Sequence, residues 1–300
     1  MEQTLIREIK SRFPGVECLE NEPMNQYTSF RVGGPAALLV QPAEPEEAAA
    51  LLGFLRERGV RTFVMGNGTN LLFPDEGYDG AVLRTVKMAA LRDLGEGRIA
   101  ACGGALLSRT AVFARDLGLT GLEFAHGIPG SVGGAVVMNA GAYGGEMKDV
   151  VIETAYLDGA GNRRTARGAA HDFAYRHSRF GEGELVLETT LQLAPGREEE
   201  ITGRMAELAA KRRASQPLDL PSAGSAFKRP QTGYAAALID QAGLKGLRVG
   251  GAQVSEKHAG FIVNAGGATC ADVLRLMDEV RSRVLAAHGV ALEPEIRVVR

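Results

Sequence analysis

The sequence predicts an α+β protein whose two regions differ in secondary structure. Runs of β-branched and aromatic residues separated by glycine-rich turns dominate up to about residue 197, and helical patterns dominate after about residue 217. Glycine is also unusually frequent, with 39 in 300 residues, or about 13% against a usual value near 7%. Because these glycines gather in clusters, we expect functional loops at the clusters.

The composition excludes several classes of protein. The chain is 45% hydrophobic, and 34 basic residues nearly balance 36 acidic ones. This balance excludes a disordered chain, a coiled coil and an electrostatically driven nucleic-acid binder. Cys18, Cys102 and Cys270 form no CxxC pair and suit a reducing compartment. Without a signal-like apolar core or a stretch of 18 apolar residues, we expect a cytoplasmic protein with no membrane partner.

Residues 44–58 give the clearest helical pattern of the first region. Pro45 stands near the first helical position, apolar side chains recur at helical spacing, and Gly59 follows the end. Similar spacing predicts helices over 4–13 and 106–117. Strands are expected over 37–43, 61–66, 80–85, 98–104 and 184–194, together with a hairpin of 151–158 and 162–166.

The second region is expected to begin with a charged helix over 198–213 and a proline-rich link over 216–224. A helix over 234–241 and strands over 252–255, 260–265 and 295–299 follow. The longest helix starts after Thr269, because Asp272 three residues on completes a capping box. Its apolar face is predicted to be buried and consists of Val273, Leu276, Met277, Val280 and Val284.

Several common site motifs are absent from the sequence. The chain has no GxxxxGK[ST], so it is not a P-loop nucleotide hydrolase. After Gly66-x-Gly68, Leu71 stands where a Rossmann fingerprint needs glycine or alanine. HExxH is missing and the five histidines never pair at ligand spacing, so we expect no catalytic metal.

Two glycine loops remain as candidate binding sites, at 66–72 and 127–135. Glycine lets backbone N–H groups approach a charged ligand closely. Neutral donors stand in the same loops at Asn67, Thr69, Asn70 and Ser131. Either loop alone could equally be a tight turn without a ligand. The two together, each flanked by apolar runs, favour a bound diphosphate cofactor.

The chain carries six motifs, in this order: TSFRVGGPA, GNGTNLL, GIPGSVGGAVVMNAGAYGGE, YRHSRF, SAGSAFKRP and LEPEIR. Together they run from about residue 27 to the C-terminus and resemble the UDP-N-acetylmuramate dehydrogenases. This family is also called the UDP-N-acetylenolpyruvoylglucosamine reductases, or MurB. The chain is similar to the shorter subgroup, since no obvious insertion supplies a substrate lid.

The resemblance implies an FAD-binding domain of the vanillyl-alcohol-oxidase (PCMH) type in two subdomains, 1–66 and 67–197. A C-terminal α+β substrate-binding domain would occupy 198–300. FAD would be bound non-covalently, and NADPH would enter the substrate's pocket as reductant. The residues implied to hold FAD are Arg31, Gly66, Asn67, Gly68, Thr69, Asn70, Leu71, Gly127, Ile128, Pro129, Gly130, Ser131, Gly133, Gly134, Asn139 and Ala140.

The resemblance also implies the reaction, which is NADPH-dependent reduction of UDP-N-acetylglucosamine enolpyruvate to UDP-N-acetylmuramate for peptidoglycan precursor synthesis. Flavin N5 would give hydride to C3 of the enol ether, and an enolate-like centre at C2 would then need a proton. Three residues match the family's catalytic positions. Arg176 would neutralise the substrate carboxylate, Ser225 would protonate C2, and Glu295 would be the family's catalytic glutamate.

Each of these three residues has a plainer alternative. Arg176 could form a surface ion pair, and Ser225 could cap a helix or a turn, with Ser222 as its rival. An ionised Glu295 would repel the enolate, so we expect it to be protonated or tied to Arg176. Glu293 is its rival, and strand alternation cannot choose between the two. Weaker candidates for substrate contacts are Tyr175, Lys228, Gln253 and Asn264.

Two other functions remain open at this point. A different flavin oxidoreductase of the same fold, acting on a sugar or sugar alcohol, would share the glycine loops without needing the three catalytic residues. A non-catalytic nucleotide-binding module would keep the loops for a regulatory ligand and would be colourless. The sequence predicts no particular protein partner.

Overall fold

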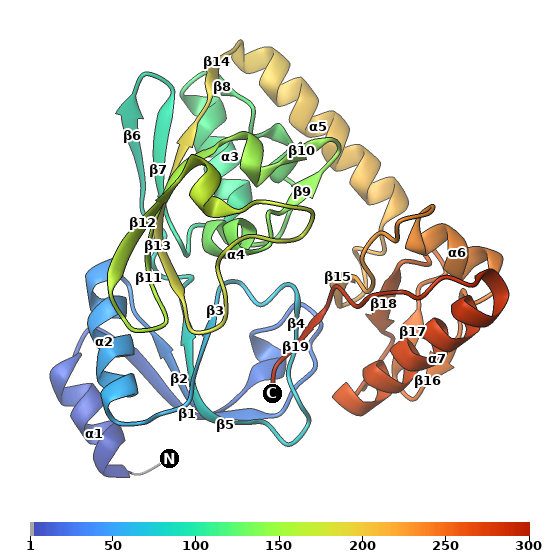
Figure 1. The fold of residues 1–300 in the computed structure, drawn as a ribbon, viewed down its shortest axis with the longest axis horizontal. Coiled ribbons are helices and arrows are strands. Elements are labelled where there is room, and N and C mark those ends of the chain that lie inside the picture. Colours follow the sequence, from blue (N-terminus) through green and yellow to red (C-terminus); the bar gives the residue numbers. More distant parts are fainter. Residues whose placement is uncertain (1–2) are drawn as a thin grey trace. The chain divides into compact units, whose positions relative to one another are not determined.

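The computed structural model describes residues 3–300 (Figure 1). The chain forms two compact units, each assembled from separate stretches of sequence. Unit 1 contains the chain up to Glu20, Ala37–Asn67 and Asp79–Lys211. Unit 2 contains Asn21–Ala36, Gly68–Tyr78 and Arg212–Arg300. The domain limits at 66/67 and 197/198 stay a prediction.

The first sheet has four strands in the order β1-β2-β5-β3. Its strands are β1 Glu17–Pro23, β2 Pro35–Gln41, β3 Thr62–Met65 and β5 Tyr78–Arg84. The helices α1 Gln3–Arg12 and α2 Pro45–Glu57 bury their apolar faces in the same core as Leu38, Val40 and Leu83. Pro45 begins α2 as the sequence predicts, and the predicted strand at 61–66 is β3.

The second sheet lies in unit 1, and all its neighbouring strands are antiparallel, in the order β12-β11-β13-β7-β6. Its strands are β6 Leu91–Gly95, β7 Arg98–Cys102, β11 Val151–Leu157, β12 Arg163–Arg167 and β13 Leu185–Gln192. The predicted hairpin is therefore confirmed as β11 and β12. The predicted strand at 98–104 ends early, because Gly103 and Gly104 turn the chain.

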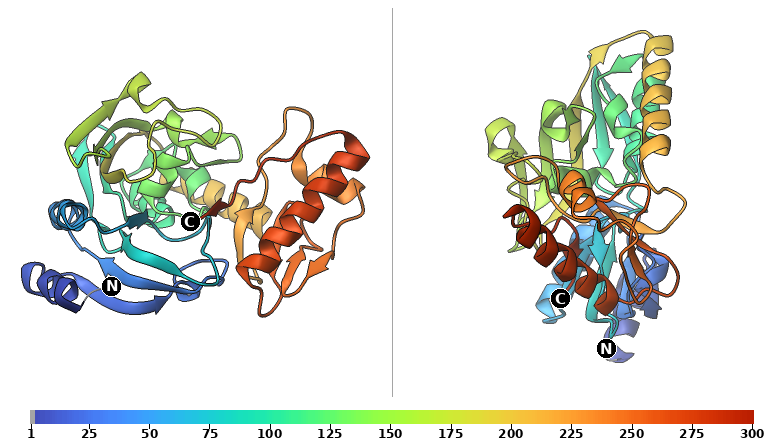
Figure 2. Two further views of the ribbon diagram at one scale, coloured as in Figure 1. Left: turned by 60° about the horizontal axis from the view of Figure 1, so that its bottom comes forward. Right: turned by 90° about the vertical axis from the view of Figure 1, so that its right-hand side faces the viewer.

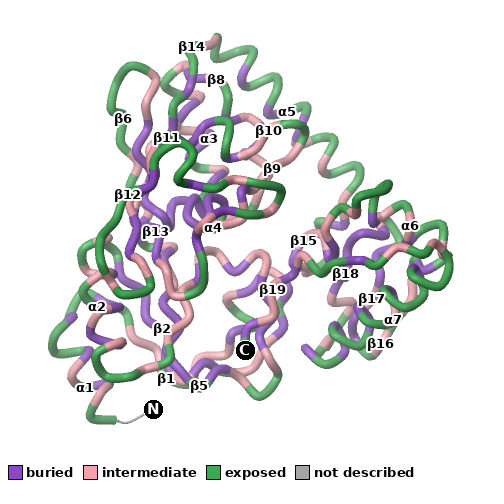
Figure 3. The backbone as a smooth tube through the Cα atoms, viewed as in Figure 1, coloured by how far each residue is buried: buried purple, intermediate pink, exposed green. Residues whose placement is uncertain are grey.

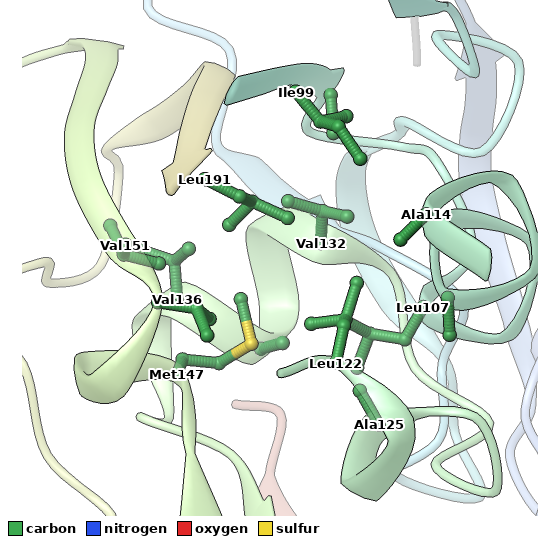
Figure 4. Packing of buried hydrophobic residues seen from close by; sticks show 14 of the residues in the cluster. Ile99, Leu107, Ala114, Leu122, Ala125, Val132, Val136, Met147, Val151 and Leu191 are labelled. Atoms are coloured by element: carbon green, nitrogen blue, oxygen red, sulfur yellow. The ribbon is translucent and has the colours of Figure 1, made fainter. Parts of the chain in front are cut away.

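Helices α3 Leu107–Asp116 and α4 Val132–Val137 share an apolar core with this sheet (Figure 4). The core contains Leu107 and Ala114 of α3, Val132 and Val136 of α4, and Leu191 of β13. Short strand pairs complete the unit: β8 Leu119–Thr120 with β14 Ala194–Pro195, and β9 Gly141–Ala142 with β10 Gly145–Glu146. The charged helix α5 Glu198–Ser215 exposes most of its length (Figure 3).

Unit 2 contains a sheet in the order β15-β18-β17-β16, covered by the long helix α7 Cys270–His288 (Figure 2). The strands are β15 Ser222–Ser225, β16 Arg248–Val249, β17 Ala252–Val254 and β18 Phe261–Asn264, and the helix α6 Ala235–Gln241 packs on α7. A separate parallel pair joins β4 Leu71–Leu72 to β19 Arg297–Val298. The proline-rich link expected over 216–224 is partly wrong. Residues Ser222–Ser225 form the strand β15, because β18 supplies a hydrogen-bonding partner.

The capping of α7 confirms the pattern read from the sequence. Thr269 and Asp272 form a reciprocal capping box, and all five residues of the predicted apolar face are buried. A second acceptor comes from far away in the chain, since the Asp75 carboxylate accepts hydrogen bonds from the N–H groups of Cys270 (2.7 Å) and Ala271 (3.0 Å). These acceptors satisfy amides that have no partner inside the helix.

Candidate cofactor and active site

The two predicted glycine loops meet in unit 1. A Cβ added at Gly66 would lie 2.1 Å from the Ser131 Oγ. Asn67 Nδ2 donates a hydrogen bond to the carbonyl oxygen of Pro129 at 2.6 Å. Gly66 has an ordinary φ, so glycine is needed there for close approach alone. The structure therefore brings together residues 66–67 and 129–131, as expected of a shared binding site.

The second loop is fixed by its backbone to the turn after β7. Gly133 N–H donates to the Gly103 carbonyl at 2.7 Å, and Val132 N–H donates to the Ala105 carbonyl at 2.7 Å. The buried Ser131 caps α4, because its hydroxyl accepts a hydrogen bond from Gly134 N–H at 3.3 Å. The helical cap accounts for one lone pair of this hydroxyl.

The first loop continues into unit 2 from Gly68. The Gly68 carbonyl accepts from Ser29 N–H at 3.1 Å, and Thr69 precedes Asn70, whose own contact is with Glu295. Arg31 has a φ of 55°, which places it in the left-handed region. From Gly68 on, the loop is thus held by hydrogen bonds within unit 2.

Arg176 stands at the tip of a very small hairpin in unit 1. Ala174 and His177 exchange two backbone hydrogen bonds of 3.1 Å, which leaves Tyr175 and Arg176 as the turn. Arg176 has a φ of 53°, a left-handed conformation that costs a non-glycine residue about 1–2 kcal/mol. Its Nη2 donates to the Gly141 carbonyl at 3.3 Å, and its guanidinium carbon lies 5.1 Å from the centre of the exposed Tyr175 ring.

Ser225 and Glu295 are neighbours in unit 2. Ser225 pairs with Phe261 in the β15–β18 ladder, so it caps no helix. The backbone N–H of Glu295 donates to the carbonyl of Ala226, the residue after Ser225, at 2.9 Å. The Asn70 side-chain amide donates to the Glu295 carbonyl at 3.1 Å. Two of the three predicted catalytic residues are therefore brought together, and convergence with Arg176 remains a prediction.

The rival residues have other partners. The carboxylate of Glu293 is exposed and forms an ion pair with the Lys228 ammonium. The backbone N–H of Lys228 donates to the Glu293 carbonyl at 2.8 Å. Ser222 pairs with Val263, two residues along β18 from the partner of Ser225. The solvated role expected for Glu293 thus agrees with its surroundings.

The remaining candidate substrate contacts lie in unit 2. The Asn264 side chain donates to the carbonyls of Phe30 and Arg31 at 3.4 Å and accepts from Gly266 N–H at 3.0 Å. Gln253 borders a cavity of about 160 Å³ that Val263 and Lys257 also line. Asn264 thus stabilises its own turn, whereas Gln253 faces space that a ligand could enter.

Sequence reasoning missed two features beside these loops. His126, directly before Gly127, has a buried Nδ1 with no hydrogen-bond partner in the part of the chain that the structure describes. Tyr143 turns the β9–β10 hairpin with a φ of 54° and exposes 42% of its surface. Its position directly before two glycines in the AYGG sequence was the available signal. An exposed aromatic residue in a strained conformation is typical of functional sites.

The electrostatics of unit 1 centre on Glu146. Its ion pair with Lys148 lowers the pKa of the Glu146 carboxyl, and a hydrogen bond from Asn139 and the charge of Arg176 act in the same direction. Burial lowers the pKa of His171, which precedes the Arg176 hairpin and stacks on Phe173. The Glu146 carboxylate is thus kept ionised, and the positive charge of Arg176 contributes to this.

The fold and its matches to known proteins define a flavoprotein with an FAD-binding domain of the vanillyl-alcohol-oxidase type. A family model described as FAD binding domain matches residues 36–167. A second model, the C-terminal domain of UDP-N-acetylenolpyruvoylglucosamine reductase, matches residues 216–299. The reductase of Heliobacterium modesticaldum is 48% identical over 94% of this chain and 90% of its own. That of Caldanaerobacter subterraneus is 47% identical over 100% of this chain and 99% of its own.

A solved structure agrees with these relatives. The UDP-N-acetylenolpyruvylglucosamine reductase (MurB) from Thermus caldophilus matches with a TM-score of 0.80 and 38% identity, over 95% of this chain and 99% of that chain. The chain belongs to the UDP-N-acetylenolpyruvoylglucosamine reductase family. The resemblance drawn from six sequence motifs is thereby confirmed.

Proposed function

We propose that this protein reduces UDP-N-acetylglucosamine enolpyruvate to UDP-N-acetylmuramate with NADPH, using non-covalently bound FAD, in peptidoglycan precursor synthesis. Family membership and the FAD-binding match support this reaction. The observation that carries it is the 2.9 Å hydrogen bond from the Glu295 N–H to the carbonyl of Ala226, the residue next to Ser225 in the chain. These residues lie within 216–299, the part matched by the reductase's own C-terminal domain.

The residues of the two loops fit FAD. Gly66 leaves no room for a Cβ beside the Ser131 side chain, and Gly133 leaves none beside the Gly103 main chain, so the main chain itself comes close at both loops. The unpartnered Nδ1 of His126 offers a further polar atom beside the second loop. The loop residues implied by the resemblance are proposed to hold the cofactor, with Arg31 as the basic residue among them. When bound, FAD supplies the hydride that the enol ether accepts.

The three proposed catalytic residues carry out the steps that the cofactor leaves to the protein. Arg176 binds the substrate carboxylate and keeps its charge as negative charge develops there. Ser225 donates its hydroxyl proton to C2. Glu295, held beside Ser225 by backbone bonds, orients the substrate's reacting end in a protonated or ion-paired form.

Substrate contacts are proposed for Tyr175, Lys228, Gln253 and Asn264. Lys228 and Asn264 have partners within the chain, so each would exchange a contact when substrate binds. We place the protein in the cytoplasm, where NADPH is available. None of the helices within residues 3–300 is both long and apolar enough to cross a bilayer.

The decisive experiment follows NADPH oxidation by the purified yellow protein with and without the enolpyruvyl nucleotide sugar. We expect flavin absorption near roughly 375 and 450 nm and one lactyl ether formed per NADPH consumed. Ser225→Ala should leave flavin reduction by NADPH intact and slow substrate reduction about 10²–10⁴-fold. Ser222→Ala, three residues away in the same strand, is the matched control. A colourless protein, or NADPH consumption that ignores the sugar nucleotide, would refute the proposal.

A further inference from the structure

The side chain of Asn139, two residues after α4, is fully buried and already supplied with partners. Its Nδ2 donates to Glu146 Oε2 at 2.9 Å and to the Ala174 carbonyl at 3.0 Å. Its Oδ1 accepts from Lys148 N–H at 2.9 Å. A side-chain amide has two N–H donors, and both are used. The side chain therefore has no N–H left to donate to a cofactor.

The partner at Ala174 begins the hairpin that carries Arg176. Two backbone hydrogen bonds are too few to keep an isolated hairpin folded in water. A second anchor stands on its other side, where the buried Ser178 hydroxyl donates to the Val137 carbonyl at 2.8 Å. Both flanks of the hairpin are thus tied to the C-terminal end of α4.

The conformation of Arg176 needs such support. A non-glycine residue with a φ of 53° persists only where its surroundings determine it strongly. Asn139 hydrogen-bonds to two residues beside Arg176: Ala174, which begins the turn, and Glu146, whose carboxylate interacts with the charge of Arg176. Asn139 follows the C-terminal end of α4, and Ser131, which contacts the first glycine loop, caps its N-terminal end. The six residues of α4 separate these two ends by about 9 Å.

We propose that the side chain of Asn139 has a positioning role: it fixes the Arg176 hairpin at a set place relative to the glycine loops and does not itself bind FAD. The inference rests on the proposed function only in taking Arg176 to bind the substrate carboxylate. A misplacement of about 1 Å is enough to cost a reaction about 10²-fold. Loss of the anchor therefore affects the reduction of the enolpyruvyl group and leaves the reduction of the flavin unchanged.

The test is a double-mutant cycle on the holoenzyme, measured by single turnover with UDP-N-acetylglucosamine enolpyruvate. Asn139→Ala should slow substrate reduction about 10–100-fold, while flavin reduction by NADPH and the Kd for FAD change less than about threefold. In an Arg176→Ala background, the same change should cost less than about twofold, because the charged group that the hairpin positions is then gone. Asn25→Ala, at an exposed position in unit 2, is the matched control.

A second measurement does not depend on activity. Hydrogen exchange at the amides of Ala174 and His177 should speed up in Asn139→Ala and also in Ser178→Ala, which loosens the other anchor. If Asn139→Ala does not fold, Ser178→Ala and Asn139→Gly, which suits the φ of 40°, take its place.

Three results would overturn the proposal. The first is a large rise in the Kd for FAD with normal substrate reduction at saturating FAD. The second is an equal loss in the wild-type and Arg176→Ala backgrounds, and the third is unchanged exchange at Ala174 and His177. A wild-type enzyme inactive on the sugar nucleotide would instead refute the proposed function, and the exchange measurement would still decide the anchoring.

Discussion

Replacing Gly66 by alanine tests whether the glycine loops are held as closely as the geometry requires. The new Cβ would lie 2.1 Å from the Ser131 Oγ and 3.2 Å from its Cβ. Ser131 cannot move aside freely, because it is 1% exposed and its hydroxyl caps α4. Overpacking of this kind costs about 1–3 kcal/mol. The Tm should fall by about 2–4 °C per kcal/mol, or roughly 5 °C.

The second variant of this experiment removes the clashing atom. Ser131→Ala loses the cap, at about 1 kcal/mol, and leaves only its Cβ near the new methyl group. In that background, Gly66→Ala should cost less than about 1 kcal/mol, since a 3.2 Å contact needs a shift of only a few tenths of an ångström. The difference between the two backgrounds measures the contact itself.

Thermal unfolding and a flavin fluorescence titration provide the assay. The Kd for FAD should rise roughly 30-fold in Gly66→Ala, which corresponds to about 2 kcal/mol. Gly53→Ala in α2 is the matched control, because no atom lies within 4 Å of its added Cβ. That control should gain up to about 1 kcal/mol of stability. Equal costs of Gly66→Ala in both Ser131 backgrounds would show that the loops do not meet as described.

Three further predictions follow from single residues. Arg176→Lys should lower single-turnover substrate reduction about 10²-fold with unchanged stability, whereas Arg176→Gly, which suits the φ of 53°, should lose that activity and gain about 1 kcal/mol in thermal unfolding. Burial lowers the pKa of His171, so its contribution to stability is complete above the unfolded-state pKa near 6.5 and falls as the pH drops below that value. In urea unfolding, the free energy of unfolding should therefore differ less between about pH 7.5 and 5.5 in His171→Phe than in the wild type. Asp75→Ala should cost about 1 kcal/mol in urea unfolding, because two N–H groups of α7 lose their acceptor.

Sequence patterns predict α7 best because its determinants are local. The capping box at Thr269 and Asp272 spans three residues, and the buried face follows from helical spacing alone. The proline and the apolar spacing of α2 work in the same way. Neither element depends on a distant partner for its limits.

Elements that depend on distant partners escape such patterns. The glycines of VGGAVV disfavour a helix, and α4 forms because Val132 and Val136 reach the core (Figure 4). The SAGS sequence of β15 has low strand propensity and becomes a strand by pairing with β18. Asp75 caps a helix 195 residues further along the chain.

The candidate site also has features that local sequence patterns predict and features that depend on contacts between distant residues. Glycine clusters mark both loops, but only the structure shows that Gly66 approaches Ser131. Alternation along the strand could not separate Glu293 from Glu295, since it places both on one face. The structure distinguishes them by their partners. The Glu293 carboxylate forms an ion pair with Lys228, whereas the N–H of Glu295 donates a hydrogen bond to the carbonyl of Ala226.

Asn70 and Asn139 each hold a main-chain carbonyl in place through a side-chain hydrogen bond. Asn70, in the first loop, donates to the carbonyl of Glu295, and Asn139, after the second, donates to the carbonyl of Ala174 beside the Arg176 turn. Each therefore joins a glycine-loop motif to the main chain that bears a proposed catalytic residue. A main-chain carbonyl is an anchor that substitution of the catalytic side chain leaves in place. The position of each catalytic main chain consequently depends on an asparagine of a glycine-loop motif within the same unit.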